Sequence, residues 1–284
     1  MIVDAQVHVW PPEAPERPWL RPGDAHLPKP FGYEDLRAEM ARAGIDRAIL
    51  IPPGWEGDRI DFVLEAAARY PDRFAAMGRI AVEDPASAAL LPGWKRRDGM
   101  LGIRLSFQKE HSSPWLDDGI ADWFWPAAER HGIPAMAFAP GRTDKMREIA
   151  LNHPGLTLVI DHMGLAREQD AQAAAVMEGT AALADCPNVY VKVSSVPLYS
   201  SEPYPYRNLH APLRRLIAAF GPKRSFWGTD ITRLWARAPR ECTYRQCVTL
   251  FTEELDFLSA DDLEWVMGRG IMQCLQWRDA LQAA

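Results

Sequence analysis

Hydrogen-bonding and titratable side chains recur where apolar segments, predicted to be β-strands, come to an end. The set comprises two histidines, an aspartate, two basic residues and three neutral side chains: Gln6, His8, Trp55, Arg104, His162, Lys192, Ser194 and Asp230. Such groups are costly to bury unless they are paired or converge on a ligand. Two imidazoles and a carboxylate can together move protons and polarise a carbonyl group. We therefore predict that His8, His162 and Asp230 are catalytic.

The first ten residues, MIVDAQVHVW, show how these groups are positioned. Apolar residues alternate with Asp4, Gln6 and His8, which predicts a β-strand with one apolar and one polar face. The chain goes on to alternate strands and helices, an order that favours a parallel sheet buried on both sides. The polar face is therefore expected inside the fold, and an edge strand at a solvent-exposed terminus is the alternative.

Eight segments of strand length recur along the chain, at residues 1–10, 47–51, 74–80, 100–105, 133–139, 156–162, 189–194 and 225–230. Predicted helices separate them at about residues 33–43, 58–70, 85–97, 120–130, 143–151, 171–184 and 213–220, and two more follow the last strand. This order predicts a single (β/α)8 TIM-barrel domain over residues 1–284 with an extra C-terminal helix. An open doubly wound sheet is the alternative, but its glycine fingerprint is missing after the first strand.

A TIM barrel carries its site at the C-terminal ends of the strands, beneath the connecting loops. Two loops, at residues 11–31 and 195–208, are long enough to form walls or lids. Substrate contacts are therefore expected from the strand ends and from the second loop: Gln6, Trp55, Arg104, Lys192, Ser194, Tyr199 and Arg207.

The basic residues have a structural alternative. Arg104 and Lys192 could pair with Asp4 or Asp161 as structural cations, although a long basic side chain at an inner strand end is well placed for a substrate carboxylate. Asp161 is expected to point away from His162, towards a helix start or a neighbouring strand.

The other candidates have alternatives too. His8 could be a core histidine, Asp230 a helix cap, and Trp55 and the loop tyrosines packing residues. The remaining histidines are expected in solvated loops or helices: His26, His111, His131, His153 and His210.

Composition narrows the class of protein. Hydrophobic residues make up 48% of the 284 residues and charged residues 25%, a globular balance. The net charge of −6 argues against a nucleic-acid partner. The four scattered cysteines suit free thiols in a reducing compartment. No signal segment and no apolar run of about 18 residues occurs, so we expect a cytoplasmic protein without a membrane partner. Assembly into a homo-oligomer is left open.

Five short motifs occur in order at the predicted strand ends: Asp4-Ala-Gln-Val-His8, Gly102-Ile-Arg104, Asp161-His-Met-Gly164, Lys192-Val-Ser194 and Trp227-Gly-Thr-Asp230. Together they resemble the amidohydrolase superfamily, and more narrowly the amidohydrolase-2 group that contains pyrone dicarboxylate lactonase and sugar lactonases such as fuconolactonase. The resemblance implies a TIM barrel in which Asp230 activates water for hydrolysis. Other members of the group are decarboxylases.

Three departures from the family pattern bear on metal and substrate. Metal-binding members begin with His-x-His and add a histidine at the end of strand five, whereas this chain has Gln6 and Ala137-Phe-Ala-Pro140. We therefore expect no metal cofactor. The alternative is zinc held by His8, His162 and Asp230, since three protein ligands can suffice. Arg233 lies where many relatives carry Pro-His, and we assign it to a substrate carboxylate.

These observations predict a metal-independent lactonase that opens a carboxylated or polyhydroxylated lactone. Water activated by Asp230 attacks the carbonyl, while His8, His162 and Arg104 polarise it and stabilise the oxyanion. One alternative is a zinc- or manganese-dependent decarboxylase or hydrolase. A noncatalytic protein that binds a small acid is the other.

Overall fold

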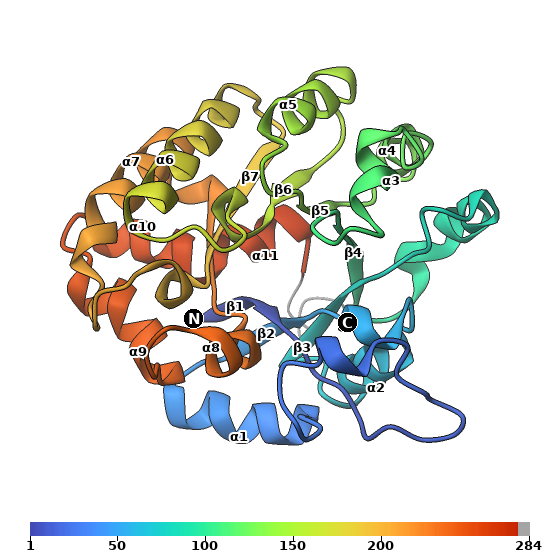
Figure 1. The fold of residues 1–284 in the computed structure, drawn as a ribbon, viewed down its shortest axis with the longest axis horizontal. Helices are drawn as coiled ribbons and strands as arrows, with labels where there is room; N and C mark the ends of the chain where they lie inside the picture. The colour runs from blue at the N-terminus through green and yellow to red at the C-terminus, as the bar shows by residue number, and fades with distance from the viewer. Residues whose placement is uncertain (278–284) are drawn as a thin grey trace.

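Eight short apolar segments form parallel strands that follow one another around a barrel, as predicted (Figure 1). The strands are β1 (Val3–Val7), β2 (Arg47–Leu50), β3 (Phe74–Gly78), β4 (Met100–Ser106), β5 (Ala135–Phe138), β6 (Leu158–Ile160), β7 (Val189–Ser194) and β8 (Ser225–Gly228). The computed structural model describes residues 1–277, so residues 278–284 of the predicted domain lie outside the described part.

Helices surround the strands on the outside (Figure 1). Those between strands are α1 (Tyr33–Ala43), α2 (Asp61–Arg69), α3 (Ser113–Asp117), α4 (Phe124–Arg130), α5 (Thr143–Asn152), α6 (Asp170–Ala181) and α7 (His210–Phe220). After β8 the described residues form four α-helices rather than the two predicted: α8 (Ile231–Arg237), α9 (Tyr244–Thr249), α10 (Ala260–Glu264) and α11 (Gly270–Leu275). No helix among residues 1–277 is long and apolar enough to cross a membrane, and all four cysteines are free, as predicted.

Three predicted elements differ in detail. The segment before β4 is a 3-10 helix, Pro85–Arg96, rather than an α-helix, and Pro92 lies inside it, where a proline cannot donate the next α-helical hydrogen bond. The helix predicted at 120–130 begins only at Phe124. Strand β6 ends at Ile160 because His162 and Met163 turn into the left-handed region, with φ of 52° and 58°.

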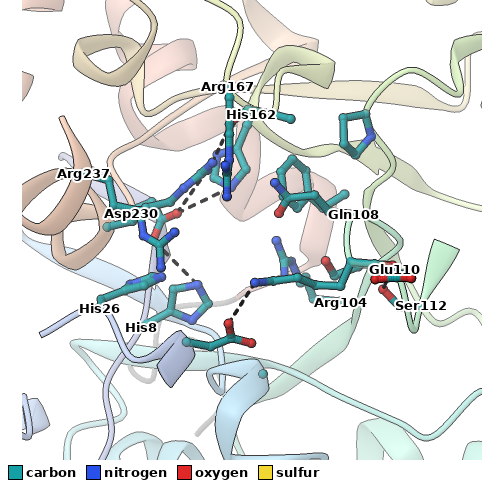
Figure 2. A pocket seen from close by; sticks show the side chains of 18 of the residues that line it. His8, His26, Arg104, Gln108, Glu110, Ser112, His162, Arg167, Asp230 and Arg237 are labelled. Atoms are coloured by element: carbon teal, nitrogen blue, oxygen red, sulfur yellow. Dashed lines mark hydrogen bonds and ion pairs between the residues drawn. The ribbon is translucent and has the colours of Figure 1, made fainter. Parts of the chain in front are cut away.

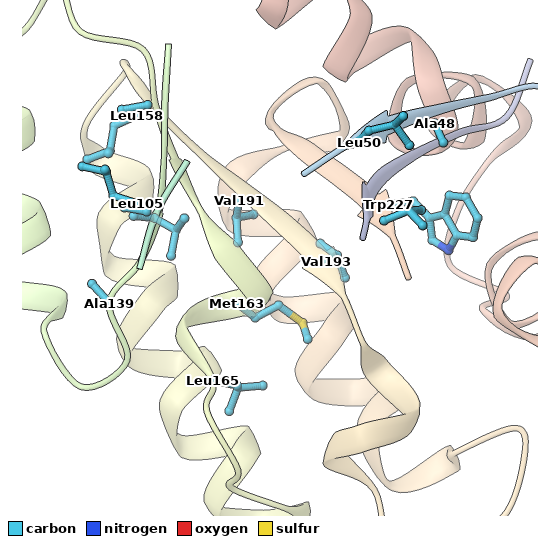
Figure 3. Packing of buried hydrophobic residues seen from close by; sticks show 14 of the residues in the cluster. Ala48, Leu50, Leu105, Ala139, Leu158, Met163, Leu165, Val191, Val193 and Trp227 are labelled. Carbon is cyan, nitrogen blue, oxygen red and sulfur yellow. The ribbon is translucent and has the colours of Figure 1, made fainter. Parts of the chain in front are cut away.

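Two sets of buried apolar side chains hold the barrel together. The larger set fills the space between sheet and helices, and it includes Leu50, Leu105, Val191 and Trp227 (Figure 3). The smaller set lies inside the barrel and consists of Val3, Ala5, Ile49, Ile51, Ala75, Met77, Leu101, Met136, Val159 and Phe226, packed with Ile271 and Leu275 of α11 and with Trp277. The predicted extra C-terminal helix thus closes the end of the barrel where the strands begin.

Strand β1 does not alternate strictly, which corrects the predicted polar face. Its pairing with β2 is irregular between Asp4 and Val7. Ala5 packs inside the barrel, whereas Val7 belongs to the outer set. A bulge of this kind shifts which face each residue occupies. Gln6 therefore reaches Lys192 inside the barrel, while Asp4 reaches Tyr244 of the outer helix α9.

Asp4 joins the last strand of the barrel to the first. Its buried carboxylate accepts hydrogen bonds from the Thr229 amide at 2.9 Å, the Gln6 amide at 3.0 Å, the Tyr244 hydroxyl at 2.8 Å and the Thr229 hydroxyl. Burial raises the pKa of this carboxyl to about 6, although the donors oppose that shift. One further bond links the same strands, since the Asp230 amide donates to the Gln6 carbonyl at 2.7 Å.

We predict that Asp4→Ala lowers the free energy of unfolding by about 3 kcal/mol or more, because it leaves several buried hydrogen-bond donors without an acceptor. Urea unfolding followed by circular dichroism measures the effect. Asp46→Ala is the matched control, because Asp46 accepts one exposed bond from the Ile2 amide at 2.8 Å. That variant should lose about 1 kcal/mol or less. Equal losses of unfolding free energy in the two variants would contradict the role of Asp4 in closing the barrel.

Candidate active site

A cavity of about 880 Å³ opens at the C-terminal ends of the strands. It has the size expected for a small-molecule site. Eight Lys or Arg side chains line it against four Asp or Glu side chains, on a chain whose net charge is −6. The cavity is therefore a positively charged region of an acidic protein, which favours an anionic ligand.

His8, His162 and Asp230 meet in this cavity. Nε2 of His8 lies 3.6 Å from Oδ1 of Asp230, and Nε2 of His162 lies 3.6 Å from Oδ2 of the same carboxylate. Figure 2 shows the two rings on either side of Asp230. Asp230 Oδ1 is buried and has no hydrogen-bond partner among the described residues. The Asp230 carboxylate thus lies between two imidazoles, with His8 facing the open Oδ1 and His162 facing Oδ2.

The chain reaches this arrangement through unusual backbone turns. His162 and Asp230 both have positive φ, 52° and 54°, directly after β6 and β8, and Ser195 after β7 has φ of 60°. Left-handed conformations of non-glycine residues cost on the order of 1–3 kcal/mol and cluster at functional sites. The turns aim both side chains into the cavity rather than along the strands.

Each of these two imidazoles is held through its other ring nitrogen, Nδ1. Nδ1 of His8 lies 2.8 Å from the Ile51 carbonyl oxygen, which can only accept, so Nδ1 carries the proton when the ring is neutral. Nδ1 of His162 lies 2.8 Å from the Ser194 hydroxyl. Burial, reinforced by the nearby cation Arg104, lowers the pKa of His8 to about 3. Burial, followed by the charge of Arg233, places the pKa of His162 well below its usual range.

A charged layer lies directly beneath the site. Asp161 pairs with Arg104 at 2.9 Å and with Lys192 at 2.7 Å, and Lys192 also donates to the Gln6 side-chain oxygen. Burial alone would raise the pKa of Asp161, yet the charges of Lys192 and Arg104 lower it. Asp161 therefore pairs with both of these cations, as the structural alternative proposed, and it does not turn away to a helix start.

The predicted substrate contacts divide into two groups. Trp55, Arg104 and Arg233 line the cavity together with the three catalytic candidates. Figure 2 shows Arg104 across the cavity from Asp230. Gln6, Lys192, Ser194 and Tyr199 do not line it. The first three belong to the supporting contacts described above, and the buried Tyr199 hydroxyl donates to the Leu165 carbonyl at 3.3 Å.

Arg207 lies away from the cavity, which corrects its assignment as a substrate contact. Its side chain is 72% exposed, and its nearest acid is Glu254 at 3.8 Å. The loop at 195–208 leaves Arg207 on the outside because its apolar residues pack into the core: Val196, Leu198, Tyr199 and Tyr206. Of this loop, only Leu198 lines the cavity.

Among the cavity residues that the sequence analysis missed are His26, His111 and Arg79. His26, expected in solvent, is partly buried: its Nδ1 lies 2.9 Å from the Thr232 hydroxyl, and its ring centre lies 5.3 Å from that of His8. Burial lowers its pKa to about 3. His26 lies in the 11–31 loop, which was predicted to cover the site, and this position could have identified it as a candidate. Arg79 directly follows Gly78 at the end of β3, and the strand-end rule would have selected it.

The donor groups do not fit a metal ion. No group of three or more His, Cys, Asp or Glu residues in the described chain is arranged to hold one. Gln6 turns its amide nitrogen towards Nε2 of His8, at 3.3 Å, and its oxygen towards Lys192. A hydrogen-bond donor thus stands where metal-binding members place a ligand nitrogen.

Comparisons with known proteins found curated relatives of similar sequence and solved structures of similar fold. A curated L-fucono-1,5-lactonase of Burkholderia ambifaria is 25% identical over 80% of this chain and 79% of its own length. A 4-sulfomuconolactone hydrolase of Hydrogenophaga intermedia is 26% identical over 72% of this chain and 66% of its own. The fold matches a zinc-bound amidohydrolase structure from Burkholderia multivorans with a TM-score of 0.80, at 19% identity over 97% of this chain and 99% of that one.

A family model described as amidohydrolase matches residues 3–269, which spans every strand of the barrel and the three residues around the open carboxylate oxygen. The match covers far more than half of the chain. The chain therefore belongs to the amidohydrolase-2 family.

Proposed function

We propose that the protein is a metal-independent lactonase that hydrolyses an anionic lactone with water activated by Asp230. The observation that carries the proposal is the open Oδ1 of Asp230, flanked by two neutral imidazoles in a cation-rich cavity. Both curated relatives described above act, by their names, on lactones, one a sugar lactone and the other a sulfonated lactone. Since a lactone has a better leaving group than an amide, carbonyl activation by hydrogen-bond donors can suffice.

His8 supports the attacking water rather than the oxyanion, which revises its expected role. Neutral His8 has its proton on Nδ1, so Nε2 is an acceptor, which the Gln6 amide nitrogen faces at 3.3 Å and Oδ1 of Asp230 at 3.6 Å. A water molecule that enters here donates one hydrogen to Oδ1 and the other to Nε2, where it takes the place of the Gln6 amide. The water oxygen then keeps a lone pair for the substrate carbonyl, and its proton passes to Asp230.

His162 and the arginines stabilise the oxyanion. The carboxylate beside Nε2 of His162 favours the tautomer with its proton there, and the Ser194 hydroxyl donates to Nδ1. Nε2 can then donate to the carbonyl oxygen as it gains negative charge, and the Arg104 guanidinium adds positive charge on the other side. One preorganised donor of this kind is worth about 3 kcal/mol. Asp230 finally returns its proton to the ring oxygen when the C–O bond breaks, which yields a hydroxy acid.

A lactone panel tests the proposed function. Hydrolysis releases one proton per hydroxy acid formed, so a pH indicator assay can follow five- and six-membered lactones with and without carboxylate groups. We expect turnover of at least one carboxylated lactone at the same rate with and without a strong chelator. Activity that disappears on chelation and returns with zinc or manganese would favour the metal-dependent alternative. Binding of small acids without turnover of any lactone would favour the alternative of a noncatalytic binding protein.

We predict that Asp230→Asn lowers kcat by at least about 10³-fold, because an amide cannot accept the proton from water. The variant should keep its fold and its melting temperature, since asparagine tolerates the left-handed backbone and the change removes a buried charge. Ligand binding by calorimetry and thermal unfolding are the control measurements. Turnover within tenfold of the unmodified protein would remove Asp230 from the mechanism.

Neutral buried histidines also predict acid sensitivity. In the folded protein the pKa values of His8 and His26 are about 3, below the ordinary value of 6.5. At a pH between these two values, the unfolded chain therefore binds more protons than the folded protein does. Stability is therefore complete above pH 6.5 and falls as pH falls, by about 2 kcal/mol per histidine at pH 5. Asp4, with its raised pKa, acts in the opposite direction, so the measurement must compare variants.

Urea unfolding at pH 7 and pH 5 makes that comparison. His8→Asn should show a smaller loss of stability at pH 5 than the unmodified protein does. His131→Gln, a change on the exposed surface, should show the same loss as the unmodified protein. Identical pH dependence in the His8 variant would mean that His8 is protonated in the folded state.

A further inference from the structure

Arg79 is a buried cation in the cavity wall that the proposed mechanism does not use. It follows the last residue of β3 and lines the cavity. Its side chain is 11% exposed, and its Nε has no hydrogen-bond partner among the described residues. The nearest carboxylate is Asp58, 3.8 Å from Nε and 40% exposed. Arg79 therefore holds its charge inside the protein with little compensation.

The other two inner arginines are better satisfied. Arg104 donates through Nε to Asp161 at 2.9 Å. Arg233 donates to the Ala166 carbonyl at 2.9 Å and lies 3.8 Å from Asp230. An arginine retained for stability would be expected to have partners of this kind, because an unpaired buried charge is costly.

Like charges gather around Arg79 instead. A Cβ built on Gly54 would lie 3.6 Å from Nη2 of Arg79 and 3.9 Å from Nη2 of Arg21, so both guanidinium groups converge on the same backbone position. Burial, followed by repulsion from Arg104, lowers the pKa of Arg79 to about 10. The guanidinium groups of Arg79 and Arg21 thus lie beside each other at the cavity wall, where Arg21 has the Gly54 carbonyl and, 3.7 Å from its Nε, Asp24 as partners.

We propose that Arg79, with Arg21, forms a subsite for a carboxylate that the substrate carries away from its lactone carbonyl. This inference rests on the proposed function and adds the position of a second acidic group on the substrate. The reacting carbonyl lies beside Asp230, which follows β8, and the second acidic group lies against the C-terminal end of β3. A planar guanidinium suits such a carboxylate, since it can donate two parallel hydrogen bonds.

A matched pair of lactones tests the subsite. One is a five-membered lactone with a carboxylate side chain, and the other is its carboxamide, which has the same shape without the charge. Arg79→Met should lower kcat/KM for the carboxylate lactone by about 10- to 100-fold, the range expected for losing a hydrogen-bonded charge pair. It should change kcat/KM for the carboxamide by less than about threefold, and it should not lower the melting temperature.

Arg73→Met is the matched control, because Arg73 precedes β3 at the opposite end of the strand and donates to the Asp46 carbonyl at 3.0 Å. It should leave the ratio of the two kcat/KM values unchanged. If Arg79→Met lowers both values equally, or lowers the melting temperature without changing their ratio, Arg79 is a structural residue and the subsite is refuted.

A binding measurement keeps the subsite separate from the reaction. Isothermal titration calorimetry compares benzene-1,3-dicarboxylate with benzoate, neither of which has an ester to hydrolyse. The unmodified protein should bind the dicarboxylate at least tenfold more tightly, and Arg79→Met should remove that preference. A preference that survives the substitution, or is absent from the start, contradicts the subsite. A panel without any hydrolysed lactone would refute the proposed function and leave this binding result to decide the subsite alone.

Discussion

The carboxylate of Asp4 closes the barrel between its last and first strands, and the geometry of the site depends on that closure. Asp4 accepts bonds from Thr229, 225 residues later in the chain, and from Tyr244 on the outer helix α9. His8 and Asp230 follow directly on the two strands that this contact joins. A buried carboxylate with several donors is rigid, because any movement would leave unpaired polar groups in the protein interior. The distance between the His8 imidazole and the Asp230 carboxylate is thereby held.

Charge compensation inside the barrel explains which polar residues reach the substrate cavity and which support it. Asp161 pairs with both Arg104 and Lys192 from below and offsets one of their two positive charges, which makes their burial less costly. Arg79 has no comparable partner, which is why its position in the wall points to the substrate rather than to the fold. The same reasoning separates Lys192, fully enclosed beneath the site, from Arg233, which lines the cavity beside Asp230.

Much of the architecture could be predicted because each strand has a short apolar pattern and each is followed by a helix or a turn. The convergence of His8, His162 and Asp230 could be predicted for the same reason, since the C-terminal ends of barrel strands meet around one opening. The 3-10 helix before β4 and the early end of β6 escaped prediction. Both depend on local backbone geometry, which the apolar pattern does not record.

The sequence by itself determined the order of the strands, their apolar faces and the residues that stand at their ends. Only the tertiary structure decided which of those residues are exposed to a ligand. The bulge in β1 turns Asp4 outward and Gln6 inward, and the positive-φ turns aim His162 and Asp230 at each other. The 11–31 loop brings His26 against His8. These outcomes depend on contacts between residues far apart in the chain, and such contacts leave no periodic signal in the sequence around each residue.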